Sequence, residues 1–186
     1  MDFVNLLFFK LNNFLSDPQT IELVVNNRFL MIVLVIVLLK FKYATYSNIW
    51  LSALINVPGT ILHETMHFLV GLFMNARPTS YDLIPRKDGF GNYVMGSVGF
   101  RNVSFYNAVP SALAPLFLLI IGYYFNHWYF NNINVNIVNY MVYILLQTII
   151  IENAVPSSTD FKVAFSYPLG LIIYSFIAVF CVIYVF

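Results

Sequence analysis

Long apolar stretches follow one another along most of this 186-residue chain, and this pattern limits its fold more than any other feature. Hydrophobic residues make up 60% of the sequence and charged residues only 9%, whereas a soluble domain carries about 25% charged residues. So few charges cannot cover the surface of a water-soluble globule, and the sequence therefore predicts an integral membrane protein embedded in a lipid bilayer. The net charge of +1 gives no indication of a nucleic-acid partner.

A membrane-spanning helix requires about 20 mostly apolar residues. About five segments satisfy this condition: Leu23 to Tyr43, Ile49 to Met74, Val109 to about Phe125–Phe130, Ile133 to Ile151, and Val163 to Phe186. Pro58 lies inside the second segment and predicts a kink or a helix restart, because proline has no backbone N–H to donate. Residues 1–22 carry apolar side chains at helical spacing, which favours a helix lying on the membrane surface. The expected fold is one all-α transmembrane domain, residues 1–186.

The segment between the second and third spans, residues 79–105, differs in composition from its neighbours. It is rich in Tyr, Val, Ile and Phe, and Lys87-Asp88-Gly89 is typical of a turn. We expect a short membrane-associated β-hairpin here. Its strand edge could receive an extended peptide by strand addition, or it could be a plain surface hairpin, and no residue in it decides between these two interpretations.

The distribution of Lys and Arg predicts the orientation in the membrane, because cytoplasmic loops carry an excess of both residues. With five spans, seven of these residues fall on the side of the N-terminus, and only Lys40 and Lys42 fall on the opposite side. The N-terminus and the loops after the second and fourth spans are therefore expected to be cytoplasmic.

His63, Glu64 and His67 form the sequence HETMH inside the second span. On an α-helix the two histidines lie about 40° apart, and the glutamate lies within about 100° of both. Two neutral imidazoles in this arrangement can bind one Zn²⁺, beside a glutamate that accepts the proton of an attacking water. An ionisable side chain at the membrane centre costs about 2.5–3.5 kcal/mol or more, so such residues need a partner or a function. The pattern predicts a zinc site within residues 49–162.

A catalytic zinc usually has a third protein ligand. Candidates in this sequence are His127, Glu152 and Asp160. His127 follows the third span on the opposite predicted side, so we do not expect it to reach the metal. Glu152 and Asp160 both lie between the fourth and fifth spans, on the side predicted for the histidines. Residues 157–160 are all of helix-capping types, so Asp160 could be a cap, a ligand or both.

An HExxH sequence in an apolar helix, followed by Asn153, Pro156 and Asp160, resembles the site-2 protease family of intramembrane zinc metalloproteases. The resemblance covers roughly Gly59 to Lys162, and the HExxH region is similar to small bacterial members without an appended domain. The family usually has glycine in place of Met66, and one more residue between the proline and the aspartate.

This resemblance implies a role for each matching residue. His63, His67 and Asp160 would bind Zn²⁺, which favours Asp160 over Glu152 as the third ligand. Glu64 would be the general base and then the general acid. Asn153 would be catalytic and substrate-binding, through a hydrogen bond to the substrate backbone or the developing oxyanion, and Pro156 would shape the substrate-binding loop.

The implied activity is hydrolysis of a peptide bond in or near a transmembrane segment of a membrane protein substrate. The reaction would occur on the cytoplasmic side of a bacterial cytoplasmic membrane, which the chain would cross several times. One alternative is a membrane zinc protease of the CAAX-processing type, with Glu152 as the third ligand. Another is a non-catalytic metal-binding membrane protein, in which Glu64 would be dispensable.

Overall fold

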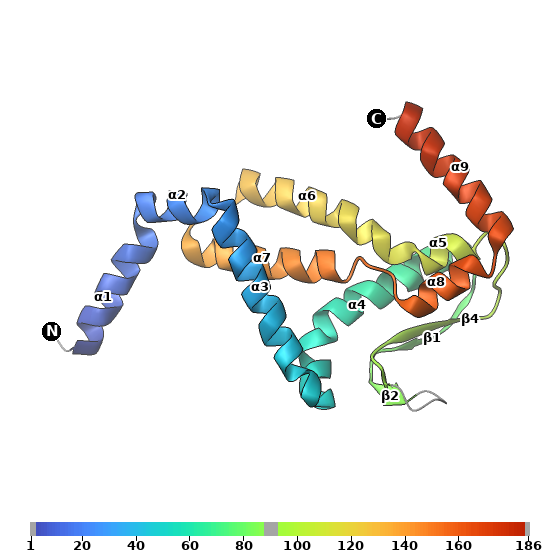
Figure 1. Cartoon of the computed structure of the whole chain (residues 1–186), viewed down its shortest axis with the longest axis horizontal. Helices are drawn as coiled ribbons and strands as arrows, with labels where there is room; N and C mark the ends of the chain where they lie inside the picture. Colours follow the sequence, from blue (N-terminus) through green and yellow to red (C-terminus); the bar gives the residue numbers. More distant parts are fainter. Residues whose placement is uncertain (1–2, 88–92, 185–186) are drawn as a thin grey trace.

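The computed structural model describes residues 3–87 and 93–184, and this part of the chain is mostly helical (Figure 1). The helices are α1 (Phe3–Ser16), α2 (Pro18–Asn26), α3 (Arg28–Ala44), α4 (Ile49–Phe73), α5 (Ala108–Ala112), α6 (Phe117–Asn132), α7 (Ile137–Glu152), α8 (Ser158–Phe165) and α9 (Pro168–Tyr184), with short 3₁₀ segments η1 (Thr45–Ser47) and η2 (Ala114–Leu116). The molecule is elongated, with α1 at one end, α9 at the other, and α6 and α7 side by side between them.

The predicted hairpin is present between α4 and α5. Strand β1 (Pro78–Asp82) pairs antiparallel with β4 (Ser97–Phe100), and β2 (Arg86–Lys87) pairs antiparallel with β3 (Tyr93–Val94). The predicted turn beyond Lys87, at Asp88 and Gly89, lies outside the described residues. Tyr81 holds β1 against α4, because its hydroxyl lies 3.0 Å from the Thr65 hydroxyl and its ring contacts Phe68 edge-on.

The five predicted spans are only partly supported by helix length and composition. Among the described residues, Phe29–Ser47 is one helical segment of 19 residues that is long and apolar enough to cross a membrane. Helices α8 and α9 would count as a second only as a broken span, because they are bent by 100° at their junction. The multi-pass topology therefore stays a prediction.

Two predicted element boundaries are wrong. Of the two outcomes predicted at Pro58, the helix restart is wrong, because α4 continues through it as a single helix of 25 residues, and the kink stays a prediction. The fifth segment is not one helix from Val163. Its helix begins at Ser158 and ends at Phe165, and a second begins at Pro168, because proline disfavours helical geometry in the residue before it.

Two other predicted helices are also divided. The surface helix expected over residues 1–22 is divided into α1 and α2, where Asp17 caps α2 by accepting the backbone N–H of Thr20 at 2.9 Å, and Pro18 opens the helix. The third segment begins as α5 and η2, and the long helix α6 starts only after Pro115.

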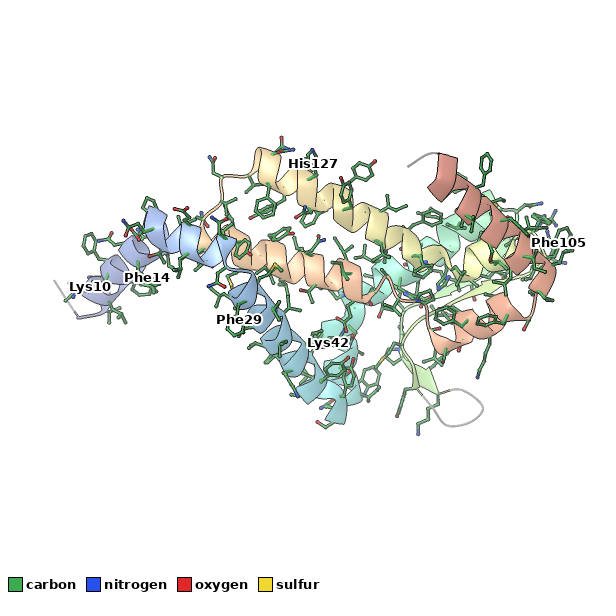
Figure 2. All side chains as sticks on the ribbon, turned by 45° about the horizontal axis from the view of Figure 1, so that its top comes forward. Lys10, Phe14, Phe29, Lys42, Phe105 and His127 are labelled. Carbon is green, nitrogen blue, oxygen red and sulfur yellow. The ribbon has the colours of Figure 1, made fainter. Side chains whose placement is uncertain are left out.

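Contacts at both ends of α7 hold this helix in place. At its beginning, Tyr140, Tyr143 and Ile144 form a buried cluster with Tyr129 of α6. At its end, Glu152 accepts a hydrogen bond from the Nζ of Lys42 at 2.7 Å, which joins α7 to α3 (Figure 2). These contacts fix the position of the residues that follow α7, which contribute to the site described below.

Candidate metal centre

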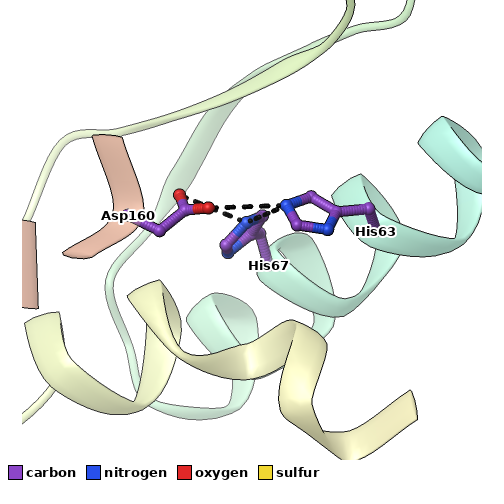
Figure 3. A group of neighbouring side chains, drawn as sticks. All are labelled: His63, His67 and Asp160. Carbon is purple, nitrogen blue, oxygen red and sulfur yellow. Dashed lines mark hydrogen bonds and ion pairs between the residues drawn. The ribbon is translucent and has the colours of Figure 1, made fainter. Parts of the chain in front are cut away.

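His63, His67 and Asp160 come together at one point between α4 and α8 (Figure 3). The two histidine Nε2 atoms are 3.1 Å apart. The Oδ2 atom of Asp160 lies 3.4 Å from His63 Nε2, and its Oδ1 atom lies 3.4 Å from His67 Nε2. The structure thus brings together the two HExxH histidines and the aspartate that the sequence favoured, although Asp160 lies 93 positions after His67 in the chain.

Backbone carbonyl groups fix the protonation of both imidazole rings. His63 Nδ1 lies 2.8 Å from the carbonyl oxygen of Asn153, and His67 Nδ1 lies 2.7 Å from that of Ser111. A carbonyl oxygen can only accept a hydrogen bond, so each Nδ1 carries the proton. In the neutral rings each Nε2 then presents a lone pair, and both lone pairs are directed at one point that the Asp160 carboxylate also faces.

This arrangement fits a bound cation. Two nitrogen lone pairs and a carboxylate repel one another at these distances. A metal ion between them would attract all three groups and could form a bond with each. Ligand atoms around a tetrahedral zinc, at about 2.0–2.1 Å from the metal, are separated by about 3.3–3.4 Å. The observed separations of 3.1, 3.4 and 3.4 Å are close to this value. The group can therefore hold a metal ion.

Asp160 is held by the start of α8. Ser157 is the N-cap residue, and its Oγ accepts the backbone N–H of Asp160 at 3.2 Å. In return, Oδ2 of Asp160 accepts the backbone N–H of Ser157 at 2.7 Å. This reciprocal capping box is a local feature of helix starts. Asp160 thus combines both predicted roles, because the same carboxylate caps α8 and faces the two histidines.

Glu64 lies beside the metal group in a cavity of about 800 Å³. Its side chain is buried, with 8% of the residue exposed, and Asp160, Thr60 and the segment between β3 and β4 also line the cavity. That segment approaches α4 closely at Gly96, where a Cβ atom would lie 2.6 Å from Thr60 and 2.9 Å from Glu64. Gly96 thus lets the hairpin cover the site without displacing the glutamate.

The other predicted site residues have different positions. Asn153 lines the cavity, and its side chain donates to the Ile149 carbonyl at 2.8 Å. Pro156 is buried and is not among the cavity residues, so the structure does not bring it to the site. It lies between Val155 and Ser157, which do line the cavity, and neighbouring residues of an irregular segment point in different directions.

Two further candidates for the third ligand do not join the group. Glu152 pairs with Lys42 and is absent from the metal group, although it borders the same cavity. His127 lies on α6, where its Nε2 accepts a hydrogen bond from the side chain of Asn131 at 3.0 Å (Figure 2). Among the described residues, the group comprises only the two α4 histidines and Asp160.

The sequence did not reveal the groups that orient the imidazoles. Ser111 and Asn153 do so through their backbone carbonyls, which every residue possesses and which therefore leave no sequence signal. A polar face of α4 ahead of the HExxH sequence was also missed. The sequence does contain the pattern that indicates this face, because Ser52, Asn56 and Thr60 recur at intervals of four residues before Glu64.

Comparisons with known proteins give no assignment: no family model, no curated protein and no solved structure matches this chain.

Proposed function

We propose that this chain is an intramembrane zinc metalloprotease that hydrolyses a peptide bond in or near a transmembrane segment of a membrane protein substrate. The observation that carries the proposal is the metal group itself. Two α4 imidazoles with fixed tautomers and the Asp160 carboxylate converge beside the buried Glu64 in a cavity large enough for a peptide segment. Two histidines, one carboxylate and a neighbouring glutamate are a donor set that catalytic zinc sites use.

Exposed apolar side chains support placement in a lipid bilayer. Large hydrophobic residues are exposed on α1, α3, α4, α6, α7 and α9, whereas a soluble monomer rarely exposes contiguous apolar patches larger than a few hundred Å². Examples are Phe29 (75% exposed), Phe73 (82%) and Phe176 (73%). Lipid would cover these surfaces, and the predicted charge distribution supports a metal group towards the cytoplasmic side.

Each residue at the site has a defined part in the proposed reaction. His63, His67 and Asp160 would hold Zn²⁺, which supplies Lewis acidity for a substrate carbonyl and for water. Glu64 would take a proton from the attacking water and deliver it to the leaving amine. Glu64 is buried but lines the cavity, where a water molecule could reach it. Asn153 keeps the His63 imidazole in its metal-binding tautomer through its carbonyl, and a contact of its side chain with substrate remains part of the proposal.

The alternative with Glu152 as third ligand has less support. The Glu152 carboxylate is engaged by Lys42 at 2.7 Å, and Asp160 already lies 3.4 Å from each histidine. A CAAX-processing type of site would require Glu152 to leave its ion pair and Asp160 to withdraw. A non-catalytic metal-binding protein would share the metal group but would not need the buried Glu64.

Zinc content and cleavage, measured on the same set of variants, test this proposal. Purified wild-type protein and Glu64→Gln should bind one equivalent of zinc, because Glu64 is not in the metal group. Asp160→Ala should lose most of the zinc. Cleavage of a co-expressed single-span membrane protein should be present in the wild type and should fall by about 10²–10⁴-fold in Glu64→Gln, which is the range for loss of a general acid–base residue. Undiminished cleavage by Glu64→Gln would refute the assignment.

A further inference from the structure

The cavity extends well beyond the metal group along the face of α4. Besides the site residues, it is lined by Ser52, Asn56 and Thr60, and at its far end by Tyr46 and Ile49. We call Ser52, Asn56 and Thr60 the polar stripe. Together with Glu64 they follow one another at every fourth residue, which places them on successive turns of one helix face. From Ser52 to Glu64 this face runs for about 18 Å along the helix axis.

Polarity on this part of α4 is confined to the cavity side. On other sides of the helix, Leu54 is 69% exposed, Val57 37% and Ile61 39%, and none of these three residues borders the cavity. Apolar side chains facing outward suit lipid contact. Three polar residues facing inward are not needed for helix formation, and in an apolar environment each unsatisfied polar group carries a cost. The polar stripe therefore calls for a partner inside the cavity.

The hydrogen-bonding groups of the stripe are only partly used. The Asn56 side-chain N–H donates to the Ser52 carbonyl at 2.7 Å, with a longer contact of 3.4 Å to the Ser52 hydroxyl. Within the described residues, the Asn56 side-chain oxygen and the Thr60 hydroxyl have no hydrogen-bond partner. They offer one acceptor and one group that both donates and accepts. This pair matches the alternating N–H and C=O groups of an extended peptide backbone.

Apolar residues also line the cavity, among polar ones, and they suit the side chains of such a peptide. The segment Val94 to Val98 lines the cavity from the hairpin, and Val155 and Val163 line it from the chain on either side of the metal-binding Asp160. Hydrogen-bonding groups along α4, with apolar residues elsewhere in the lining, suit an unwound, apolar segment whose backbone has lost its helical hydrogen bonds within the membrane.

We infer that the polar stripe is a binding subsite for about five extended residues of an apolar substrate segment on one side of the scissile bond. This number is the distance of about 18 Å along α4 from Ser52 to Glu64, divided by the rise of about 3.3 Å per residue in an extended chain. The inference rests on the proposed protease function and deepens it, because it names the substrate form as an unwound apolar segment recognised through its backbone. Asn56 and Thr60 are the substrate-binding residues.

A binding measurement without turnover tests this subsite. The protein is zinc-loaded Glu64→Gln in detergent micelles, and the probe is a fluorescein-labelled peptide of valine, alanine and glycine. In this background, Asn56→Leu combined with Thr60→Val should weaken probe binding about 2- to 12-fold for each lost hydrogen bond. Thr60→Val alone hardly changes the side-chain volume. Its probe affinity therefore still tests the subsite if Asn56→Leu disturbs folding. Thr148→Val on α7, which does not border the cavity, is the matched control and should bind the probe normally.

A second probe identifies which part of the peptide is recognised. The same peptide with methylated backbone nitrogens keeps its side chains but cannot donate hydrogen bonds. It should bind more weakly to the parent protein, and Asn56→Leu should no longer affect its binding, because the free Asn56 oxygen can only accept a hydrogen bond. Equal binding of the first probe to parent and stripe variants, with zinc affinity unchanged, would overturn the inference. Reduced cleavage with unchanged probe affinity would also overturn it, since that result indicates a path for water rather than a peptide subsite.

The same measurement separates this inference from the proposed function. If the probe binds through the polar stripe but the protein cleaves no substrate, the result supports the subsite and refutes the proposed protease function. Cleavage that depends on Glu64 but is insensitive to the stripe variants would retain the protease and reject the subsite.

Discussion

Replacing Ser157 by alanine should weaken zinc binding, although Ser157 is not in the metal group. The Ser157 hydroxyl accepts the backbone N–H of Asp160 at 3.2 Å, and the two residues form the capping box of α8. Alanine removes the hydroxyl and keeps the second contact, from the Ser157 backbone N–H to Oδ2 of Asp160. The carboxylate would then be held less firmly at its position between the two histidines.

The size of the effect follows from the energy of the cap. Loss of a serine N-cap costs about 0.5–2 kcal/mol, typically about 1 kcal/mol. Without metal, the carboxylate and the two Nε2 lone pairs repel one another, so the first turn of α8 is expected to relax. The cap then contributes mainly to the metal-bound state, and its loss should lower zinc affinity about 2- to 25-fold, with a central value near fivefold.

Competition with a zinc-binding chromophore measures this change on detergent-purified protein. Ser158→Ala is the matched control, because it removes the adjacent serine hydroxyl without touching the capping box. Equal zinc affinities of Ser157→Ala and Ser158→Ala would refute the reasoning. They would show that α8 holds Asp160 equally well in both states, so that cap and metal site are energetically independent.

Two other variants test the surroundings of the site. Glu152→Gln should keep full zinc binding and should lower the free energy of unfolding by about 1–3 kcal/mol in denaturant titration, because Lys42 loses the carboxylate that accepts its hydrogen bond; loss of zinc would instead identify Glu152 as a ligand. Gly59→Ala should lower zinc affinity about 10-fold or more, because the new Cβ would overlap the side-chain amide of Asn153, whose carbonyl orients the His63 ring. Gly122→Ala, with its nearest contact at 3.3 Å, is the control, and an equal affinity in both glycine variants would count against that coupling.

Local sequence rules predicted much of the candidate site. The spacing of His63 and His67 places both imidazoles on one face of any α-helix, whatever surrounds it. Capping preferences pointed to a helix start near Asp160, and strand and turn composition pointed to the hairpin after α4. These rules act over a few residues, so they hold before the chain has folded. Boundaries at proline were harder, because Pro58 is tolerated within α4 whereas Pro168 coincides with the 100° bend between α8 and α9.

What the sequence alone determined is the chemistry available to this protein: an apolar chain that carries two imidazoles and a glutamate on one helix, with carboxylates further along. Only the tertiary structure decided which carboxylate meets the imidazoles, which carbonyls fix their tautomers, and that the polar stripe borders the same cavity. The physical reason is the distance along the chain between the residues that interact. Helical spacing is set by neighbouring residues, whereas the approach of Asp160 to His67 depends on how α4, α7 and α8 pack, and backbone carbonyls carry no side-chain identity that a sequence can display.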